Sequence, residues 1–257
     1  MKEIQIFNLV VAIVYLLTEV FCLVATVKCF SIPKFRTGLA LIPIFLCFHI
    51  VLIINSLILL NKFYEFIEQE VFEIFNCTSA IGKDLFLLFF TSRILGVVGG
   101  WEKNNKLPNI IKVFIWILIP LHLGTSIVVK ILTNVRKLSI YLGTMGLFIA
   151  LLYGYTCIKI LPHFRNKHIH SNNGYLRWLL ITIIYMIFAC EVKIFYNISE
   201  FLGLSDKLQA KDDLFREILY KCTGFITTLI PIILMTYCLF KFASISNSET
   251  EEELDEY

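Results

Sequence analysis

The sequence predicts an all-helical membrane protein with seven transmembrane helices, and three observations carry this prediction. Of the 257 residues, 58% are hydrophobic and only 17% are charged, which is more apolar surface than a soluble domain of this length can bury. The apolar residues are grouped in runs of about 18 residues or more, the length that a helix needs to cross a bilayer. Short polar segments separate these runs, so residues 1–243 are predicted to form one transmembrane domain.

Each predicted span is an apolar run bounded by polar or charged residues. The first contains Glu19, and it is too long and lacks the cleavage site of a secretory signal peptide. The third is the most polar, because Lys83, Asp84 and Arg93 flank or interrupt it. The seven spans follow the hydropathy pattern and cover residues 5–27, 39–60, 84–101, 110–131, 139–161, 177–198 and 219–242.

Prolines and glycines lie inside several of these spans. Pro43, Pro120 and Pro231 are expected to kink the second, fourth and seventh helices or to free carbonyl groups there. Gly96 and Gly99 are expected to allow a close helix approach on the third. The acidic, polar segment at residues 244–257 follows the last span and is predicted to be a disordered cytoplasmic tail.

The orientation depends on two acidic loops, because Lys and Arg are nearly balanced between the two sides. The loops at 61–83 and 199–218 are predicted to lie on the same side. They carry or adjoin the glycosylation sequons at Asn76 and Asn197. We therefore predict an external N-terminus, with unused sequons as the alternative. Cys77 and Cys222 are predicted to lie on this same side, where a disulfide could join them.

Two pairs of similar segments indicate an internal repeat. IPKFR at 32–36 matches LPHFR at 161–165, and VFEIFNCT at 71–78 matches LFREILYKCT at 214–223. Their positions fit a 3+1+3 duplication, a plan known among transporters. The layout is shared by the SWEET sugar transporters, but the prolines within the spans do not follow the pattern of that family.

Five ionisable residues on five spans are predicted to share one layer near the middle of the membrane. Because an unpaired charge there costs about 2.5–3.5 kcal/mol, these side chains are expected to face the interior of the bundle. The layer consists of Glu19, His49, Arg93, His122 and Glu191.

Within this layer, Arg93 is expected to pair with Glu191, Glu19 or both, since a guanidinium can bind two carboxylates. The histidines could carry protons or could simply hold helices together. Neutral hydrogen-bonding groups expected at similar depth are Tyr153, Thr227 and Thr228. Lys193 is interpreted as an anchor that reaches the membrane interface.

These features favour a carrier of a small polar or anionic solute. The alternatives are a heptahelical receptor, a structural subunit of a membrane complex, or an intramembrane lipid enzyme. The residues show no nucleophile–base triad, no metal-ligand spacing, no cofactor motif and no basic patch for nucleic acid. The predicted partners are the lipid bilayer, a small solute or ligand, and a cytosolic protein at the basic inner loops. The membrane is predicted to be the plasma membrane or an endomembrane.

Overall fold

The structure is a computed structural model. It describes residues 2–31, 41–64, 68–101, 106–132, 135–165, 173–203 and 213–241. All regular elements within these ranges are helices, which confirms the predicted fold class. They are α1 (Lys2–Ser31), α3 (Ile42–Tyr64), α4 (Gln69–Trp101), α5 (Leu107–Leu132), α6 (Val135–Arg165), α7 (Asn173–Phe201), α9 (Asp213–Gly224) and the π-helical segment η2 (Phe225–Leu229), which continues as a helix over residues 230–241.

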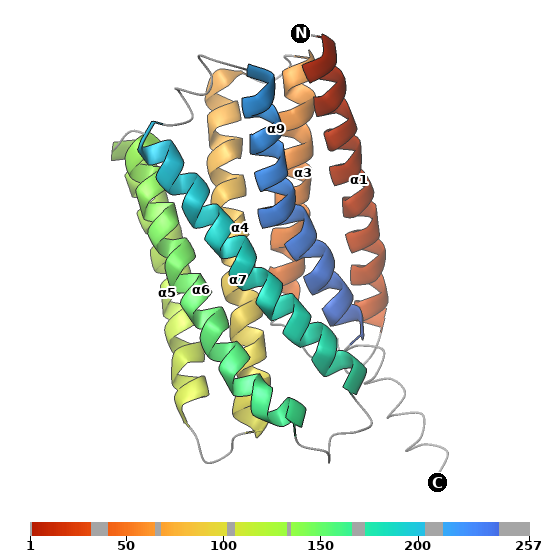
Figure 1. Ribbon diagram of the computed structural model, residues 1–257, viewed down its shortest axis with the longest axis vertical. Helices are drawn as coiled ribbons and strands as arrows, with labels where there is room; N and C mark the ends of the chain where they lie inside the picture. The colour runs from red at the N-terminus through yellow and green to blue at the C-terminus, as the bar shows by residue number, and fades with distance from the viewer. Residues whose placement is uncertain are drawn as a thin grey trace.

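The long helices lie side by side and alternate in direction along the chain (Figure 1). Successive helices pack against each other from α1 through α3 to α4, and α4 then contacts both α5 and α6. Helix α6 packs on α7, and η2 and α9 return the chain to α7 and α1. Helix α4 therefore lies between neighbours on several sides, whereas α5 packs mainly on α4.

Six of the helices are long and apolar enough to cross a membrane, which supports an integral membrane protein. The six segments are Ile4–Ser31, Ile42–Asn61, Leu107–Val129, Ser139–Pro162, Arg177–Phe201 and Glu217–Lys241. The outer faces of these helices carry large apolar side chains, such as Leu17 on α1 and Ile117 on α5, which are 65% and 62% exposed. Such faces are stable against lipid and not against water.

Helix α4 is the remaining long helix, and its polarity has a structural explanation. The predicted span began at residue 84, but the helix already begins at Gln69, so the loop predicted at 61–83 is largely helical. Hydropathy detects only the apolar part of a helix and misses a polar extension. Asp84, Thr91 and Ser92 are buried among the neighbouring helices, so they make no contact with lipid.

The core between the helices is rich in phenylalanine. Phe48 of α3 meets Phe45 at a ring-centroid distance of 6.0 Å and Phe86 of α4 at 5.3 Å, both edge to face. All three rings are buried. Edge-to-face pairs of this kind contribute about 0.5–1.5 kcal/mol each beyond the burial of their surface, and the pair of Phe48 with Phe86 holds α4 against α3.

The π-helical segment follows from the position of Pro231. The N–H of Ile230 bonds to the carbonyl of Phe225 in the wider π pattern. The next π-type donor for the carbonyl of Ile226 would be residue 231, and proline has no N–H. The hydroxyl of Tyr185 on α7 donates to that carbonyl instead, at 3.2 Å. The pair ties α7 to η2.

Only some of the segments that make up the predicted repeat lie among the described residues. The segments at 71–78 and 214–223 lie near the N-terminal ends of α4 and α9, in matching positions of the two halves. IPKFR at 32–36, the tail at 244–257 and most of the basic inner loops lie outside the described residues. The repeat, the external N-terminus and the count of seven membrane crossings stay predictions.

Gly82 provides a test of how α3 and α4 pack. A Cβ atom at this position would lie 2.6 Å from Cγ2 of Val51, which is fully buried. We expect Gly82→Ala to lower the free energy of unfolding by about 1–3 kcal/mol through overpacking, measured as a lower Tm in detergent.

Gly124→Ala is the matched control, because nothing lies within 4 Å of a Cβ atom there. Its higher helix propensity should leave the Tm unchanged or raise it. Val51→Ala should restore part of the Tm lost by Gly82→Ala. Equal effects of the two glycine substitutions would contradict the close approach of α3 to α4.

Candidate functional site

A buried carboxylate at Asp84 is the centre of the most polar part of the bundle. Asp84 lies near the middle of α4, and its side chain is 0% exposed. Its Oδ1 accepts a hydrogen bond from Nζ of Lys193 on α7. Its Oδ2 lies 3.4 Å from Nε2 of His122 on α5, which is also 0% exposed. One carboxylate therefore connects three helices.

His122 extends this cluster to a fourth helix. Its Nδ1 lies 2.8 Å from the hydroxyl of Tyr141 on α6, and the two rings stack at a centroid distance of 5.5 Å. If the Tyr141 hydroxyl donates to Nδ1, the ring proton is on Nε2 and faces Asp84. The 3.4 Å separation from Asp84 is long for a hydrogen bond, so this contact is chiefly electrostatic. We call Asp84, His122, Tyr141 and Lys193 the Asp84 cluster.

The Asp84 cluster is neutral as a unit when His122 is uncharged. The positive charge of Lys193 balances Asp84, which satisfies the requirement that buried charges be paired. The pair also joins α4 to α7, which both pack on α6. Loss of one partner would leave an uncompensated charge inside the bundle, a change that costs several kcal/mol.

Two further lysines surround the Asp84 cluster. The charges of Lys193 and of Lys221 on α9 both act on the neighbouring Lys83 of α4. Lys221 is 4% exposed, and its Nζ lies 3.2 Å from Glu217. The carboxylates whose charges act in the same region are Asp84, Glu191, Glu200 and Glu217. This part of the bundle therefore combines three ammonium groups with carboxylates from α4, α7 and α9.

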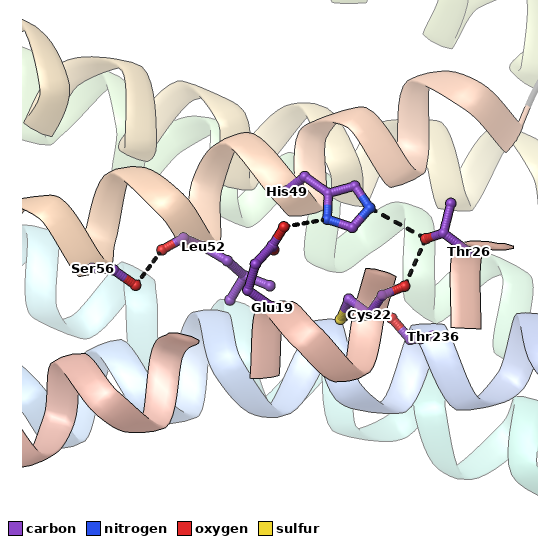
Figure 2. Close-up of polar contacts among 7 residues, drawn as sticks. All are labelled: Glu19, Cys22, Thr26, His49, Leu52, Ser56 and Thr236. Atoms are coloured by element: carbon purple, nitrogen blue, oxygen red, sulfur yellow. Dashed lines mark hydrogen bonds and ion pairs between the residues drawn. The ribbon is translucent and has the colours of Figure 1, made fainter. Parts of the chain in front are cut away.

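A second cluster lies between α1 and α3 and is drawn in Figure 2. Oε1 of Glu19 is 2.7 Å from Nδ1 of His49, and the side chains are 15% and 18% exposed. Nε2 of His49 lies 3.2 Å from Oγ1 of Thr26. The Thr26 hydroxyl itself donates to the carbonyl of Cys22 at 2.7 Å. We call Glu19, His49 and Thr26 the Glu19 cluster.

The hydrogen bonds of the Glu19 cluster assign its protons. Thr26 has one hydroxyl proton, which bonds to the carbonyl of Cys22, so its oxygen must accept from His49. Nε2 of His49 therefore carries a proton. The contact between Nδ1 and Glu19 then contains one more proton, on either the ring or the carboxylate. The pair has no net charge in both arrangements.

The Glu19 cluster also reaches the C-terminal helix. Sγ of Cys22 lies 3.4 Å from Oγ1 of Thr236, and both residues are buried. Figure 2 shows this contact beside the Glu19–His49 pair. A short series of contacts, through His49, Thr26 and Cys22, thus connects Glu19 to the helix over residues 230–241.

Arg93 does not pair with Glu191 in the described structure. It is half-buried and forms no ion pair with a described residue. It lines a cavity of about 20 Å³, which has room for about one water molecule. The other lining residues are Phe90, Ile94, Val97, Leu179, Cys238 and Leu239.

Glu191 and Lys193 have exchanged the roles that the sequence indicated. Glu191 is exposed on α7, whereas Lys193 is half-buried and binds Asp84. Two residues apart on a helix means about 200° of rotation, so only one of them can face the interior. Lys193 therefore binds a buried carboxylate, where the sequence suggested an anchor at the membrane interface; its depth in the membrane stays a prediction. The contact between Lys193 and Asp84 could not be inferred from hydropathy, because the predicted third span began at Asp84 and α4 begins at Gln69.

The predicted neutral residues lie at separate places. The hydroxyl of Tyr153 on α6 donates to the carbonyl of Leu87 on α4 at 3.0 Å and is fully buried. Thr227 donates to the carbonyl of Thr223 at 2.8 Å. Oγ1 of Thr228 is buried with no hydrogen-bond partner among the described residues. None of the three lines the cavity at Arg93, and a role in ligand binding stays a prediction.

The structure also bears on the sequons and the predicted disulfide. Asn197 is 7% exposed within α7, and its glycosylation stays a prediction. Asn76 is half-buried within α4, and its glycosylation stays a prediction. Cys77 is half-buried on α4 and Cys222 is exposed on α9, and a disulfide between them stays a prediction. Over the described ranges, no three side chains of His, Cys, Asp or Glu gather as a metal-binding set.

Double-mutant cycles separate the two candidate ion pairs. We expect Asp84→Asn and Lys193→Met each to lower the free energy of unfolding by about 3–5 kcal/mol, because each leaves a buried polar partner unmatched. The double substitution should cost clearly less than their sum. The measurement is reversible unfolding in detergent micelles.

Arg93→Gln and Glu191→Gln provide the matched cycle. Because these side chains form no ion pair, their effects should add within about 0.5 kcal/mol. Coupling at Arg93–Glu191 with none at Asp84–Lys193 would refute the arrangement described here.

Comparison with known proteins gives no relative from which a function could be transferred. No protein-family model, no curated protein and no solved structure matches the chain. The geometry of the two buried clusters is therefore the basis for the proposed function.

Proposed function

We propose that the protein is an integral membrane carrier of a small anionic solute, with seven membrane crossings and an external N-terminus, in the plasma membrane or an endomembrane. The observation that carries this proposal is the buried Asp84–Lys193 ion pair with Lys83 and Lys221 beside it. A buried ionisable group within a membrane bundle is a functional candidate, because its burial is costly. Here the ammonium groups of Lys83, Lys193 and Lys221 lie close enough for their charges to act on one another, which supports an anionic solute.

The ion pair offers a way to couple binding to movement. A carboxylate or phosphate that reached Lys193 and Lys83 would compete with Asp84 for the same ammonium groups. It would thereby weaken the direct link between α4 and α7. A ligand shifts a conformational equilibrium only through contacts that differ between the two states, and exchange of Asp84 for the solute is such a difference.

His122 and Tyr141 would stabilise the released carboxylate. When Asp84 loses Lys193, the ring of His122 remains at Oδ2, and Tyr141 holds that ring in place. A proton on Nε2 of His122 would then face Oδ2 and stabilise the charge of Asp84. The cluster thus has a second way to stabilise its buried charge.

The main alternative is a heptahelical receptor, in which the same ion pair would hold one of two states. The cavity beside Arg93, at about 20 Å³, is too small for a ligand and fits a closed state of either a carrier or a receptor. Net movement of solute distinguishes them, because a receptor binds its ligand without moving it across the membrane.

Uptake into proteoliposomes tests the carrier. The probes are radiolabelled inorganic phosphate, succinate and glutamate, with glucose as the uncharged control. We expect accumulation of at least one anion above protein-free liposomes. Lys193→Gln should reduce its rate at least tenfold, about 1.4 kcal/mol of lost binding to the solute.

Two further variants keep this test informative. Glu191→Gln, on the exposed side of α7, should transport like the unmodified protein. The double variant Asp84→Asn/Lys193→Gln removes both charges of the buried pair, so it is expected to fold but to lose uptake. Uptake by that double variant at the normal rate, or no uptake of any anion by the unmodified protein, contradicts the proposal.

A further inference from the structure

The Glu19 cluster has an acceptor that the folded structure leaves unused. Oε2 of Glu19 is buried and has no hydrogen-bond partner among the described residues. Oε1 of the same carboxylate is fully engaged by His49 at 2.7 Å. A buried acceptor without a donor costs about 1–3 kcal/mol, so this oxygen calls for a functional explanation.

Proton balance shows which change the pair tolerates. Removal of the shared proton would leave Nδ1 of His49, as a bare acceptor, 2.7 Å from a carboxylate oxygen, and the two would repel each other. Addition of a proton to Oε2 of Glu19 leaves the bond between Nδ1–H and Oε1 intact. The pair then changes from neutral to one positive charge. Gain of a proton is therefore the step that preserves the geometry.

The surroundings of the pair contain few other charges. On α1, the thiol of Cys22 feels the charge of Glu19, and the buried phenol of Tyr15 lies one helical turn before Glu19. On α3 the titratable group is His49 itself, and the helix over residues 230–241 presents Thr236 next to Cys22. Figure 2 shows Ser56 turned to the carbonyl of Leu52 and away from Glu19. No lysine or arginine among the described residues forms an ion pair with Glu19.

The side chains of the Glu19–His49 pair are more exposed than those of the Asp84–His122 pair. Glu19 and His49 are 15% and 18% exposed, whereas Asp84 and His122 are both 0% exposed. The first pair lies nearer the surface of the bundle, whereas the second is sealed by the surrounding helices. The two clusters are thus suited to different tasks.

We propose that the Glu19–His49 pair is a proton-binding site, in which the incoming proton is taken up by Oε2 of Glu19 while His49 remains bound to Oε1. The added positive charge lies between α1 and α3. It acts on the helix over residues 230–241 through Cys22 and Thr236. In the proposed carrier this makes transport proton-coupled, and only that use of the proton rests on the proposed function; proton binding itself does not.

Infrared difference spectroscopy tests proton binding without any solute. The full chain in lipid nanodiscs is stepped between neutral and acidic pH, and the C=O stretch of newly protonated carboxyl groups is recorded. We expect Glu19→Gln to remove one carboxyl component of this difference spectrum. Asp84→Asn, at the sealed cluster, should leave that component in place.

His49→Gln provides the independent arm. Without the imidazole, Oε1 of Glu19 loses its hydrogen-bond partner, so the C=O stretch of the protonated carboxyl group should move to a different frequency. This readout would not follow from a purely structural contact between α1 and α3. It also remains available should Glu19→Gln fail to fold.

Two results would overturn the proposal. One is an unchanged carboxyl spectrum in folded Glu19→Gln, with folding checked by its Tm and elution volume. The other is no shift of the component in His49→Gln. Failure of anion uptake would count against the proposed carrier and leave this site untouched, so the two failures are distinguishable.

Discussion

The fold depends on how its buried charges are neutralised. Asp84 is fully buried on α4, and its balance comes from Lys193 on α7. The bundle can place this carboxylate inside only because α4 is covered by α3, α5 and α6. A polar helix inside a ring of apolar helices is stable in lipid, since its charges are paired within the protein. The arrangement of the other helices around α4 follows from that requirement.

The two polar clusters solve the same physical problem in different ways. The Asp84 cluster balances one acid with one ammonium and seals both from solvent. The Glu19 cluster balances an acid with an imidazole whose proton can move between them, and it remains partly exposed. In the proposed carrier, the first holds the helices in one arrangement until an anion competes for Lys193, and the second gains and loses a proton. Together they would provide the charge changes that such a proton-coupled carrier requires.

Packing fixes the geometry in which these clusters act. The edge-to-face rings of Phe48 and Phe86 and the close approach at Gly82 hold α3 on α4. The π-helical turn before Pro231 is held to α7 by Tyr185. Because these contacts are short and buried, a rearrangement of the bundle must move whole helices and not single side chains.

The sequence by itself determined the all-helical class and the apolar spans, because long apolar runs are a local property of the chain, and the structure supports six of the seven predicted spans. Of the five ionisable residues predicted to share one layer, Glu191 is exposed. The sequence also put Glu19 and His49 in one layer, and the structure brings them into contact. The partners of Asp84 were decided only by the tertiary structure. Hydropathy set Asp84 at the edge of a span, and the polar start of α4 hid its depth. Which of Glu191 and Lys193 faces inward depends on the rotation of α7 about its axis, and that rotation is set by packing against α6 and not by the residues of α7 alone.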